Sequence, residues 1–116
     1  MVLDINNIPS VEPETLEDLL KEGYLLIDVR EQDEWDAGHH KNATHLPMGD
    51  IIEKVDNFNN NEKYIFVCRS GARSGRVTSF MNSKNIESYN LSGGMKQLNN
   101  FSDEIYDLDG NSGQII

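Results

Sequence analysis

Residues 64–76 of the chain read Tyr64-Ile65-Phe66-Val67-Cys68-Arg69-Ser70-Gly71-Ala72-Arg73-Ser74-Gly75-Arg76. The four apolar residues at the start are typical of a strand that is buried on both faces of a sheet. This run ends at Cys68, the only cysteine among the 116 residues. A polar turn with glycine follows, and then Val77, Phe80 and Met81 recur at helical spacing, which predicts a helix over 72–84. The stretch therefore predicts a strand, a tight loop and a helix, with the cysteine where the strand ends.

The surroundings of Cys68 favour a reactive thiol. Three of the chain's four arginines, Arg69, Arg73 and Arg76, lie within the eight residues after it. Cations and the backbone N–H groups at a helix start lower the pKa of a thiol, and the same groups bind anions. A lone cysteine after an apolar run is often only a small buried hydrophobic residue. Such a residue needs neither the glycines nor the cations, so we interpret Cys68 as a nucleophile.

The rest of the chain alternates apolar strands with amphipathic helices. A second continuous apolar run predicts a buried strand at 24–29, and short strands are expected near 10–11 and at 88–91. Helices are expected over 13–22, 31–37, 50–57 and 95–100. This alternation is typical of an α/β fold in which helices cover both faces of a parallel sheet. We expect one domain over 1–116, with a core at about 9–101 and a loose tail at 102–116.

Two local patterns give sharper expectations about helix ends. Asp50 with Glu53 three residues later resembles a capping box at the start of the helix over 50–57. Asn85 follows the helix over 72–84, and asparagine readily takes the left-handed conformation that ends a helix. We therefore expect a side-chain cap at Asp50 and a positive φ at Asn85.

Composition narrows the classes of partner. The net charge of −10 at pH 7 argues against nucleic acid and against an anionic membrane surface. No apolar run approaches the ~20 residues of a membrane span, and the first residues lack the basic region of a signal peptide. One cysteine and three histidines, His39, His40 and His45, form no recognisable set of metal ligands, so we expect neither metal nor cofactor. These features fit a protein of the reducing cytoplasm.

Four segments that follow one another along the chain carry a resemblance. They are Asp28-Val29-Arg30 with Glu34-Trp35 and Gly38-His39, then Ala43-Thr44-His45-Leu46-Pro47, then Val67-Cys68-Arg69-Ser70-Gly71-Ala72-Arg73-Ser74, and finally Leu91-Ser92-Gly93-Gly94-Met95. Together they resemble the signatures of rhodanese-type sulfurtransferases over nearly the whole chain. Each piece alone is weakly specific, but four in order are strong. The resemblance implies a rhodanese-like sheet of about five parallel strands. His40 departs from the pattern, because the family usually has an aliphatic residue there.

The resemblance implies a thiosulfate sulfurtransferase that works through a persulfide on the catalytic Cys68. The thiolate would take the outer sulfur of a donor such as thiosulfate, expel sulfite, and pass the sulfur to cyanide, a small thiol or a protein cysteine. Backbone N–H groups of the loop would cradle the charged sulfur. The expected substrate-binding residues are Arg69, Ser70, Gly71, Ala72 and Arg73. The expected partners are a small anionic donor and a protein that donates or accepts sulfur.

Two kinds of role are assigned to charged residues. We infer from their charge that Arg69 and Arg73 attract and orient the donor. Asp28, Arg30 and Glu34 resemble the family residues that brace the loop region. Arg30 and Glu34 are four apart, so the simplest expectation for them is an ion pair.

Other classes of protein stay open as alternatives. Cysteine phosphatases and arsenate reductases also use a thiolate in an arginine-bearing loop. The phosphatases have Cys-x5-Arg, whereas Ser74 occupies that position here and the spacing from Cys68 to Arg73 is Cys-x4-Arg. A thiol-relay arsenate reductase needs a second cysteine, which the chain lacks. A non-catalytic binding module of the same fold, or a persulfide carrier that docks on a partner protein, is the remaining alternative.

Overall fold

A five-stranded parallel sheet forms the centre of the computed structural model, which describes residues 7–116. Its strand order is β1-β6-β5-β2-β4. The strands are β1 (Ser10–Val11), β6 (Ser88–Leu91), β5 (Tyr64–Val67), β2 (Leu25–Asp28) and β4 (Thr44–His45), and every neighbouring pair is parallel. The expected parallel α/β sheet is therefore confirmed, with the strand before Cys68 at its middle.

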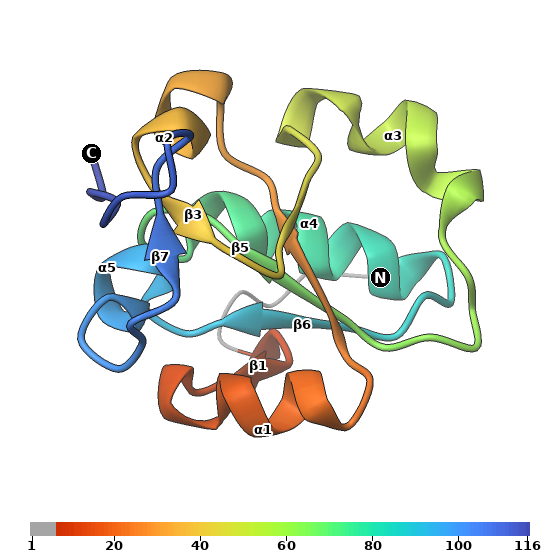
Figure 1. Ribbon diagram of the computed structural model, residues 1–116. Helices are drawn as coiled ribbons and strands as arrows, with labels where there is room; N and C mark the ends of the chain where they lie inside the picture. Colours follow the sequence, from red (N-terminus) through yellow and green to blue (C-terminus); the bar gives the residue numbers. More distant parts are fainter. Residues whose placement is uncertain (1–6) are drawn as a thin grey trace.

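Helices cover both faces of this sheet (Figure 1). The 3-10 turn η2 (Pro13–Thr15) continues into α1 (Leu16–Lys21), which lies on one face with α5 (Gly94–Leu98). The other face carries η3 (Met48–Asp50), α3 (Ile51–Lys54), η4 (Val55–Asn57) and the longest helix, α4 (Ala72–Ser83). A shorter helix, α2 (Gln32–Ala37), follows β2. None of the helices within residues 7–116 is long and apolar enough to cross a membrane.

The central strand explains why its apolar run is continuous. Tyr64 and Phe66 point into the cluster beneath α3 and α4, while Ile65 and Val67 point into the cluster beneath α1 and α5. All four are buried. Since successive side chains of a strand face opposite sides, a strand covered on both faces must be apolar at every position. Each such side chain stabilises the fold by about 1.5–3 kcal/mol when it leaves water.

The two expectations about helix ends have different outcomes. Asn85 has φ +64°, so the expected left-handed residue is confirmed. The capping box at Asp50 is wrong, because Asp50 makes no side-chain cap hydrogen bond. Its N–H already donates to Pro47 in the preceding 3-10 turn, and its backbone is helical (φ −97°, ψ −6°) rather than extended. A capping box forms instead at α2, where the side chains and backbones of Glu31 and Glu34 bond reciprocally.

The segment after residue 101 is ordered against the domain, contrary to the expected loose tail. Its strand β7 (Ile105–Tyr106) pairs antiparallel with β3 (His39–His40). Ile105 is only 5% exposed. Further along, the Gln114 N–H donates to the Ala37 carbonyl at 2.8 Å. The polar, glycine-rich composition of this segment indicated mobility, whereas the main-chain pairing that holds it depends on a partner strand far away in the sequence.

Candidate active site

The loops that follow three neighbouring strands meet at the carboxyl edge of the sheet. Asp28 at the end of β2 is the register partner of Val67 at the end of β5. The neighbouring strand β6 runs parallel to β5, so its end at Leu91 faces the same edge. Ligand sites of open α/β sheets lie at this edge, where the connecting loops meet. The loops after 28, 67 and 91 therefore form one candidate site around Cys68.

The Cys68 sulfur lies at the bottom of its loop. Cys68 is 1% exposed. The Gly71 N–H donates to Sγ at 3.1 Å, and the Ser74 hydroxyl approaches Sγ to 3.2 Å. Gly71 is the N-cap of α4 and has φ +110°, a conformation that favours glycine. This turn lets the chain curl back over the sulfur, so that donors from the loop and from the first turn of α4 converge on it.

Backbone N–H groups at the start of α5 bind carbonyl groups of the Cys68 loop. The Met95 N–H donates to the Cys68 carbonyl at 2.8 Å, and the Lys96 N–H donates to the Arg69 carbonyl at 3.0 Å. In a planar trans peptide the C=O and N–H point in opposite directions, so the Arg69 carbonyl held by α5 turns the Ser70 N–H toward the sulfur. A Cβ on Gly94 would lie 2.5 Å from the Arg69 carbonyl carbon, so this close contact requires glycine.

The net effect of these contacts is a lowered pKa for Cys68. Burial raises the pKa of the thiol. Hydrogen bonds from the Ser74 hydroxyl and from the N–H groups of Ser74, Gly71 and Ser70 lower it by more, because they stabilise the thiolate. The direction agrees with the sequence-based expectation. The largest lowering contributions are hydrogen bonds, however, and not the arginine charges that the sequence emphasised.

Replacing Ser74 by alanine should raise the Cys68 pKa. The thiolate loses a hydroxyl donor while its burial stays the same, and a hydrogen bond to a charged group is worth about 1.5–3 kcal/mol, or roughly one to two pH units. We expect the pH midpoint of iodoacetamide alkylation to move upward by that amount. The rate near pH 7 should then fall, and the rate well above both midpoints should stay unchanged. Ser79→Ala on the same helix is the control, and equal midpoints for Ser74→Ala and wild type would contradict the assignment.

Arg73 forms a bidentate ion pair with an acidic residue of α2. Its Nη1 and Nη2 donate to Glu34 Oε1 and Oε2 at 2.7 and 2.8 Å. The hydrogen bond from Arg73 lowers the pKa of Glu34, so the carboxylate stays ionised well into acid. This bidentate pair fastens α2 to the first turn of α4. The expected ion pair between Arg30 and Glu34 is wrong, because Glu34 bonds to Arg73 instead.

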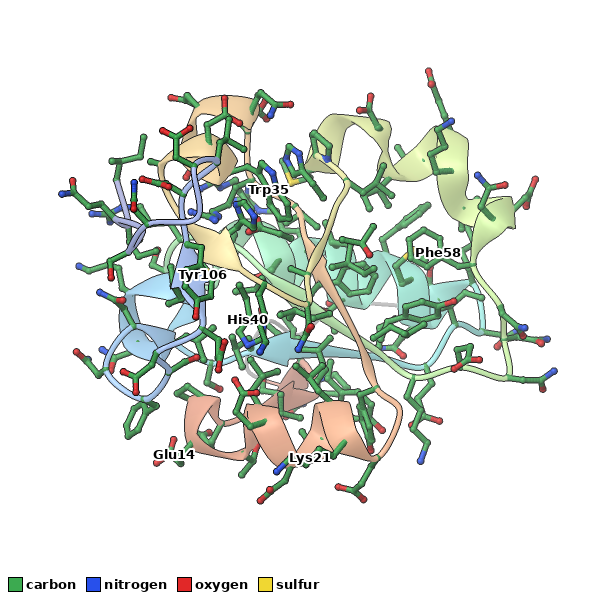
Figure 2. All side chains as sticks on the ribbon, in the orientation of Figure 1. Glu14, Lys21, Trp35, His40, Phe58 and Tyr106 are labelled. Carbon is green, nitrogen blue, oxygen red and sulfur yellow. The ribbon has the colours of Figure 1, made fainter. Side chains whose placement is uncertain are left out.

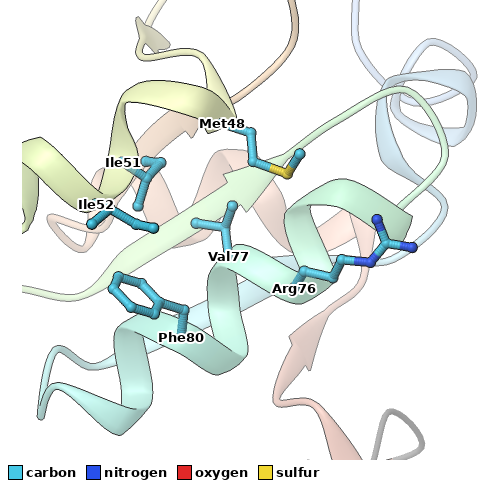
Figure 3. Close-up of a pocket in the computed structure, with 6 residues that line it drawn as sticks. All are labelled: Met48, Ile51, Ile52, Arg76, Val77 and Phe80. Carbon is cyan, nitrogen blue, oxygen red and sulfur yellow. The ribbon is translucent and has the colours of Figure 1, made fainter.

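The other two arginines of the motif point in different directions. Arg69 is exposed, and its Nε donates to the main-chain oxygen of Ile116 at 3.0 Å. Arg76 lies on the side of α4 that faces α3, where it lines an apolar pocket of about 140 Å³ (Figure 3). The other residues of this pocket are Met48, Ile51, Ile52, Val77 and Phe80. The three arginines therefore have different partners, although they are close in sequence.

Beneath the loop region lies a buried ion pair. Asp28 and Arg30 are both 0% exposed, with Arg30 Nη2 2.7 Å from Asp28 Oδ2 and Nε 2.9 Å from Oδ1. The same Nη2 donates to the Gly38 carbonyl at 2.7 Å, and the His45 Nε2–H donates to the Arg30 carbonyl at 2.7 Å. The pair thus joins the end of β2 to the segment after α2 and to β4. Both residues are buried at the end of β2, and their role in bracing the loop region stays a prediction.

Two of the three histidines share one aromatic partner, and the third is buried elsewhere. The rings of His39 and His45 stack on Trp35, with centroids 3.7 and 4.7 Å away. His40, labelled in Figure 2, is completely buried. Its Nδ1 accepts the Asn42 N–H, so its Nε2 carries the proton that is donated to Glu17 at 2.8 Å. Its polar atoms are therefore satisfied where the family usually has an aliphatic residue. Within residues 7–116, no three His, Cys, Asp or Glu side chains are grouped to hold a metal ion.

Two site residues were missed by the sequence analysis. Asn90 on β6 donates from Nδ2 to the Gly71 carbonyl at 3.1 Å, and its Oδ1 lies 2.6 Å from the Ser74 hydroxyl. A hydroxyl has one proton, so Ser74 donates either to Asn90 or to the Cys68 sulfur, and ionisation of the thiol favours the second. For Ser74 the sequence did carry a signal: Ser74 and Thr78 are polar residues four apart on the buried face of a helix. For Asn90 it carried none.

Comparison with known proteins finds similar chains and a matching family model. The family model for the rhodanese-like domain matches residues 12–101. The putative sulfurtransferase YtwF of Bacillus subtilis is 40% identical over 74 residues, which are 64% of this chain and 72% of that protein. The putative sulfur carrier protein YrkF of the same organism is 28% identical over 71 residues, and the match covers 60% of this chain but only 38% of YrkF. The chain therefore spans less than half of this second relative.

Solved structures show the same architecture. The crystal structure of a rhodanese-like domain protein from Staphylococcus aureus is 33% identical, covers 78% of this chain and 90% of that one, and has a TM-score of 0.73. A rhodanese-related protein from Thermoplasma volcanium is 24% identical, with a TM-score of 0.78 over 84% of this chain and 96% of that one. At this lower identity the likeness supports the fold alone.

Proposed function

Because the chain belongs to the rhodanese-like domain family, we propose that it transfers sulfane sulfur through a persulfide formed on Cys68. Relatives named as sulfurtransferases support sulfur transfer in general. The observation that carries the specific proposal is the ring of donors around Sγ, made by the Gly71 N–H and the Ser74 hydroxyl. Such a ring stabilises a negative sulfur, which both a thiolate and a terminal persulfide provide.

The proposed reaction has two displacement steps. The Cys68 thiolate attacks the outer sulfur of thiosulfate, the S–S bond breaks, and sulfite leaves with the bonding electron pair. The cysteine then carries a terminal persulfide anion inside the loop. An acceptor such as cyanide, a small thiol or a protein cysteine attacks this outer sulfur, and the Cys68 thiolate is the leaving group. The lowered pKa of Cys68 means that no separate general base is required.

The other loop residues have supporting roles in this proposal. The backbone of Ser70, Gly71 and Ala72 lines the site of the transferred sulfur, and the exposed Arg69 attracts the anionic donor. The guanidinium of Arg73 is paired with Glu34, so we assign it mainly to holding the loop in shape, with a weaker role in donor binding than the sequence suggested. The buried Asp28–Arg30 pair braces the sheet edge beneath.

We also propose a protein as the physiological partner. One relative is named a putative sulfur carrier protein, and others are named tRNA sulfurtransferases. These names support a sulfur relay between proteins. We propose that this domain receives or delivers sulfur in a reducing compartment such as the cytoplasm, where its one thiol stays free. No nucleic acid contact by this chain is proposed, since its net charge is −10.

Intact-mass spectrometry tests the proposed function directly. The reductant-free protein is incubated with thiosulfate, and we expect a gain of one sulfur atom, about 32 Da, that cyanide or dithiothreitol removes. A gain only with a persulfidated donor protein would identify a carrier that does not use thiosulfate. The absence of an adduct with either donor would contradict the proposal. Phosphatase and arsenate reductase assays would then test the oxyanion alternatives.

A further inference from the structure

The hydroxyl of Ser74 lies between two acceptors and can donate to only one of them at a time. Its Oγ is 3.2 Å from Cys68 Sγ and 2.6 Å from Asn90 Oδ1. Ser74 is 0% exposed, so bulk water does not reach the hydroxyl. A hydroxyl carries a single proton, and the shorter distance is typical of an O–H···O bond. The two contacts are therefore alternatives, and the charge on the sulfur decides between them.

The orientation of the Asn90 amide follows from its second contact. Its Nδ2 donates to the Gly71 carbonyl at 3.1 Å, and a carbonyl oxygen only accepts, so Oδ1 must face Ser74. Asn90 is the register partner of Phe66 on the central strand β5, so the sheet holds this acceptor in place. A Cβ on Gly75 would lie 3.4 Å from Asn90 Nδ2, which shows how closely the first turn of α4 packs on it. Asn90 thus presents a fixed acceptor to Ser74 from outside the loop.

The two charge states of Cys68 use the Ser74 proton differently. While Cys68 is a thiol, its S–H can donate weakly to Ser74 Oγ, and Ser74 donates to Asn90 Oδ1. When the thiol ionises, the charged sulfur becomes the stronger acceptor and the Ser74 proton turns to it. Asn90 Oδ1 then loses its donor. Asn90 therefore stabilises the thiol relative to the thiolate and offsets part of the effect of Ser74.

We propose that Asn90 is a positioning residue that holds the Ser74 hydroxyl while the sulfur is uncharged and yields it when the sulfur becomes negative. The inference rests on the proposed function and deepens it, because it assigns control of the nucleophile to a residue outside the loop. A thiolate loses nucleophilicity as its pKa falls, and an attacking thiol works best with a pKa near the surrounding pH. Competition from Asn90 prevents the donors around Cys68 from acidifying it so far that its thiolate becomes a weak nucleophile.

A double-mutant cycle on the full chain tests this competition. The pH midpoint of iodoacetamide alkylation is measured for the wild type, Ser74→Ala, Asn90→Leu and the double variant. Ser74→Ala should raise the midpoint in both backgrounds, and by about half to one pH unit more when Asn90 is leucine. That difference is the size of the neutral hydrogen bond that Ser74 no longer gives up. Loosening of the loop through the lost bond to Gly71 is present in both backgrounds and cancels.

The sign of the coupling separates two roles for Asn90. If Asn90 only orients Ser74 toward the sulfur, Ser74→Ala should have a smaller effect in the Asn90→Leu background. An equal or smaller effect therefore overturns the inference. The charged pairs on neighbouring elements, Arg73–Glu34 and Asp28–Arg30, are the same in all four chains. Asn60→Leu, which removes an exposed amide, is the control and should leave the effect of Ser74→Ala unchanged.

An NMR titration gives a second test without any change at Asn90, and it decides the question if Asn90→Leu fails to fold. The carbon-13 shift of Asn90 Cγ should change at the pH midpoint of Cys68, because Oδ1 loses the Ser74 proton there. In Ser74→Ala most of this change should be absent, and only the through-space effect of the thiolate charge should remain. A change of the same size in both proteins would overturn the inference.

Neither measurement depends on sulfur transfer, so the outcomes separate this inference from the proposed function. The expected coupling in a protein that forms no persulfide would support the role of Asn90 in controlling the thiol and remove the proposed function. Absent coupling in a protein that does form the persulfide would remove the role of Asn90 and leave the proposed function in place.

Discussion

Cys68→Ser is expected to abolish sulfur transfer, with a loss of at least about 10³-fold in kcat/KM. A serine hydroxyl is not ionised near neutral pH, and an oxygen cannot form the persulfide that links the two displacement steps. The loop should stay folded, because the replacement is nearly isosteric and its oxygen can still accept the Gly71 N–H that now donates to Sγ. Activity is measured as thiocyanate formed from thiosulfate and cyanide.

Two further measurements make this result specific. Intact mass after thiosulfate should show no sulfur adduct on Cys68→Ser, and the thermal unfolding midpoint should lie within a few degrees of the wild type. Ser79→Ala, on the same helix but outside the loop, is the matched control and should keep both the adduct and the activity. A serine variant with more than a small fraction of wild-type turnover would remove Cys68 from the chemistry, since the chain has no second cysteine.

Asp28→Asn is expected to lower the free energy of unfolding by about 3–5 kcal/mol. The change leaves the Arg30 guanidinium at 0% exposure without its counter-charge, and burying an unpaired charge is far more costly than burying a matched pair. A loss of this size is a large part of the stability of a small domain. Because Arg30 also bonds the Gly38 carbonyl, the segment after α2 should loosen as well.

Urea unfolding measures this effect. Asp103→Asn removes a carboxylate of the same kind from an exposed position and should change the free energy of unfolding by no more than about 0.5 kcal/mol. The midpoint should fall for Asp28→Asn without a change in the slope of the transition. A variant within 1 kcal/mol of the wild type, as a rough threshold, would show that the guanidinium is stabilised by groups other than Asp28.

Much of the fold followed from local patterns. The apolar runs at 24–29 and 64–67 predicted buried strands, and β2 and β5 are central neighbours in the sheet. Glycine and asparagine marked the helix ends correctly, as Asn85 shows. Two predictions failed, one for a local reason and one for a long-range reason. Asp50 was expected to cap a helix but sits inside a preceding 3-10 turn, and the segment after 101 was expected to be loose but pairs through β7 with β3.

The candidate site was found from sequence in part. The strand, loop and helix around Cys68 are contiguous in the chain, so their geometry could be inferred from local rules. The partners of the charged residues could not. Arg30 bonds Asp28 and not Glu34, and Glu34 bonds Arg73, which lies 39 residues away in the chain. The hydrogen bonds from Asn90 to Gly71 and Ser74 could not be predicted from the sequence either, because they depend on β6 lying beside β5.

The sequence by itself determined the class of fold and the strand, loop and helix around Cys68, and it singled out Cys68 as the proposed nucleophile. These follow from hydrophobic period, from glycine at a backbone turn and from one cysteine at a strand end, all of which are properties of neighbouring residues. Only the tertiary structure decided which donors reach the sulfur and which partner each arginine of the loop finds. Hydrogen bonds and ion pairs need distances near 3 Å, and only packing of the whole chain brings residues as distant as Arg69 and Ile116 that close.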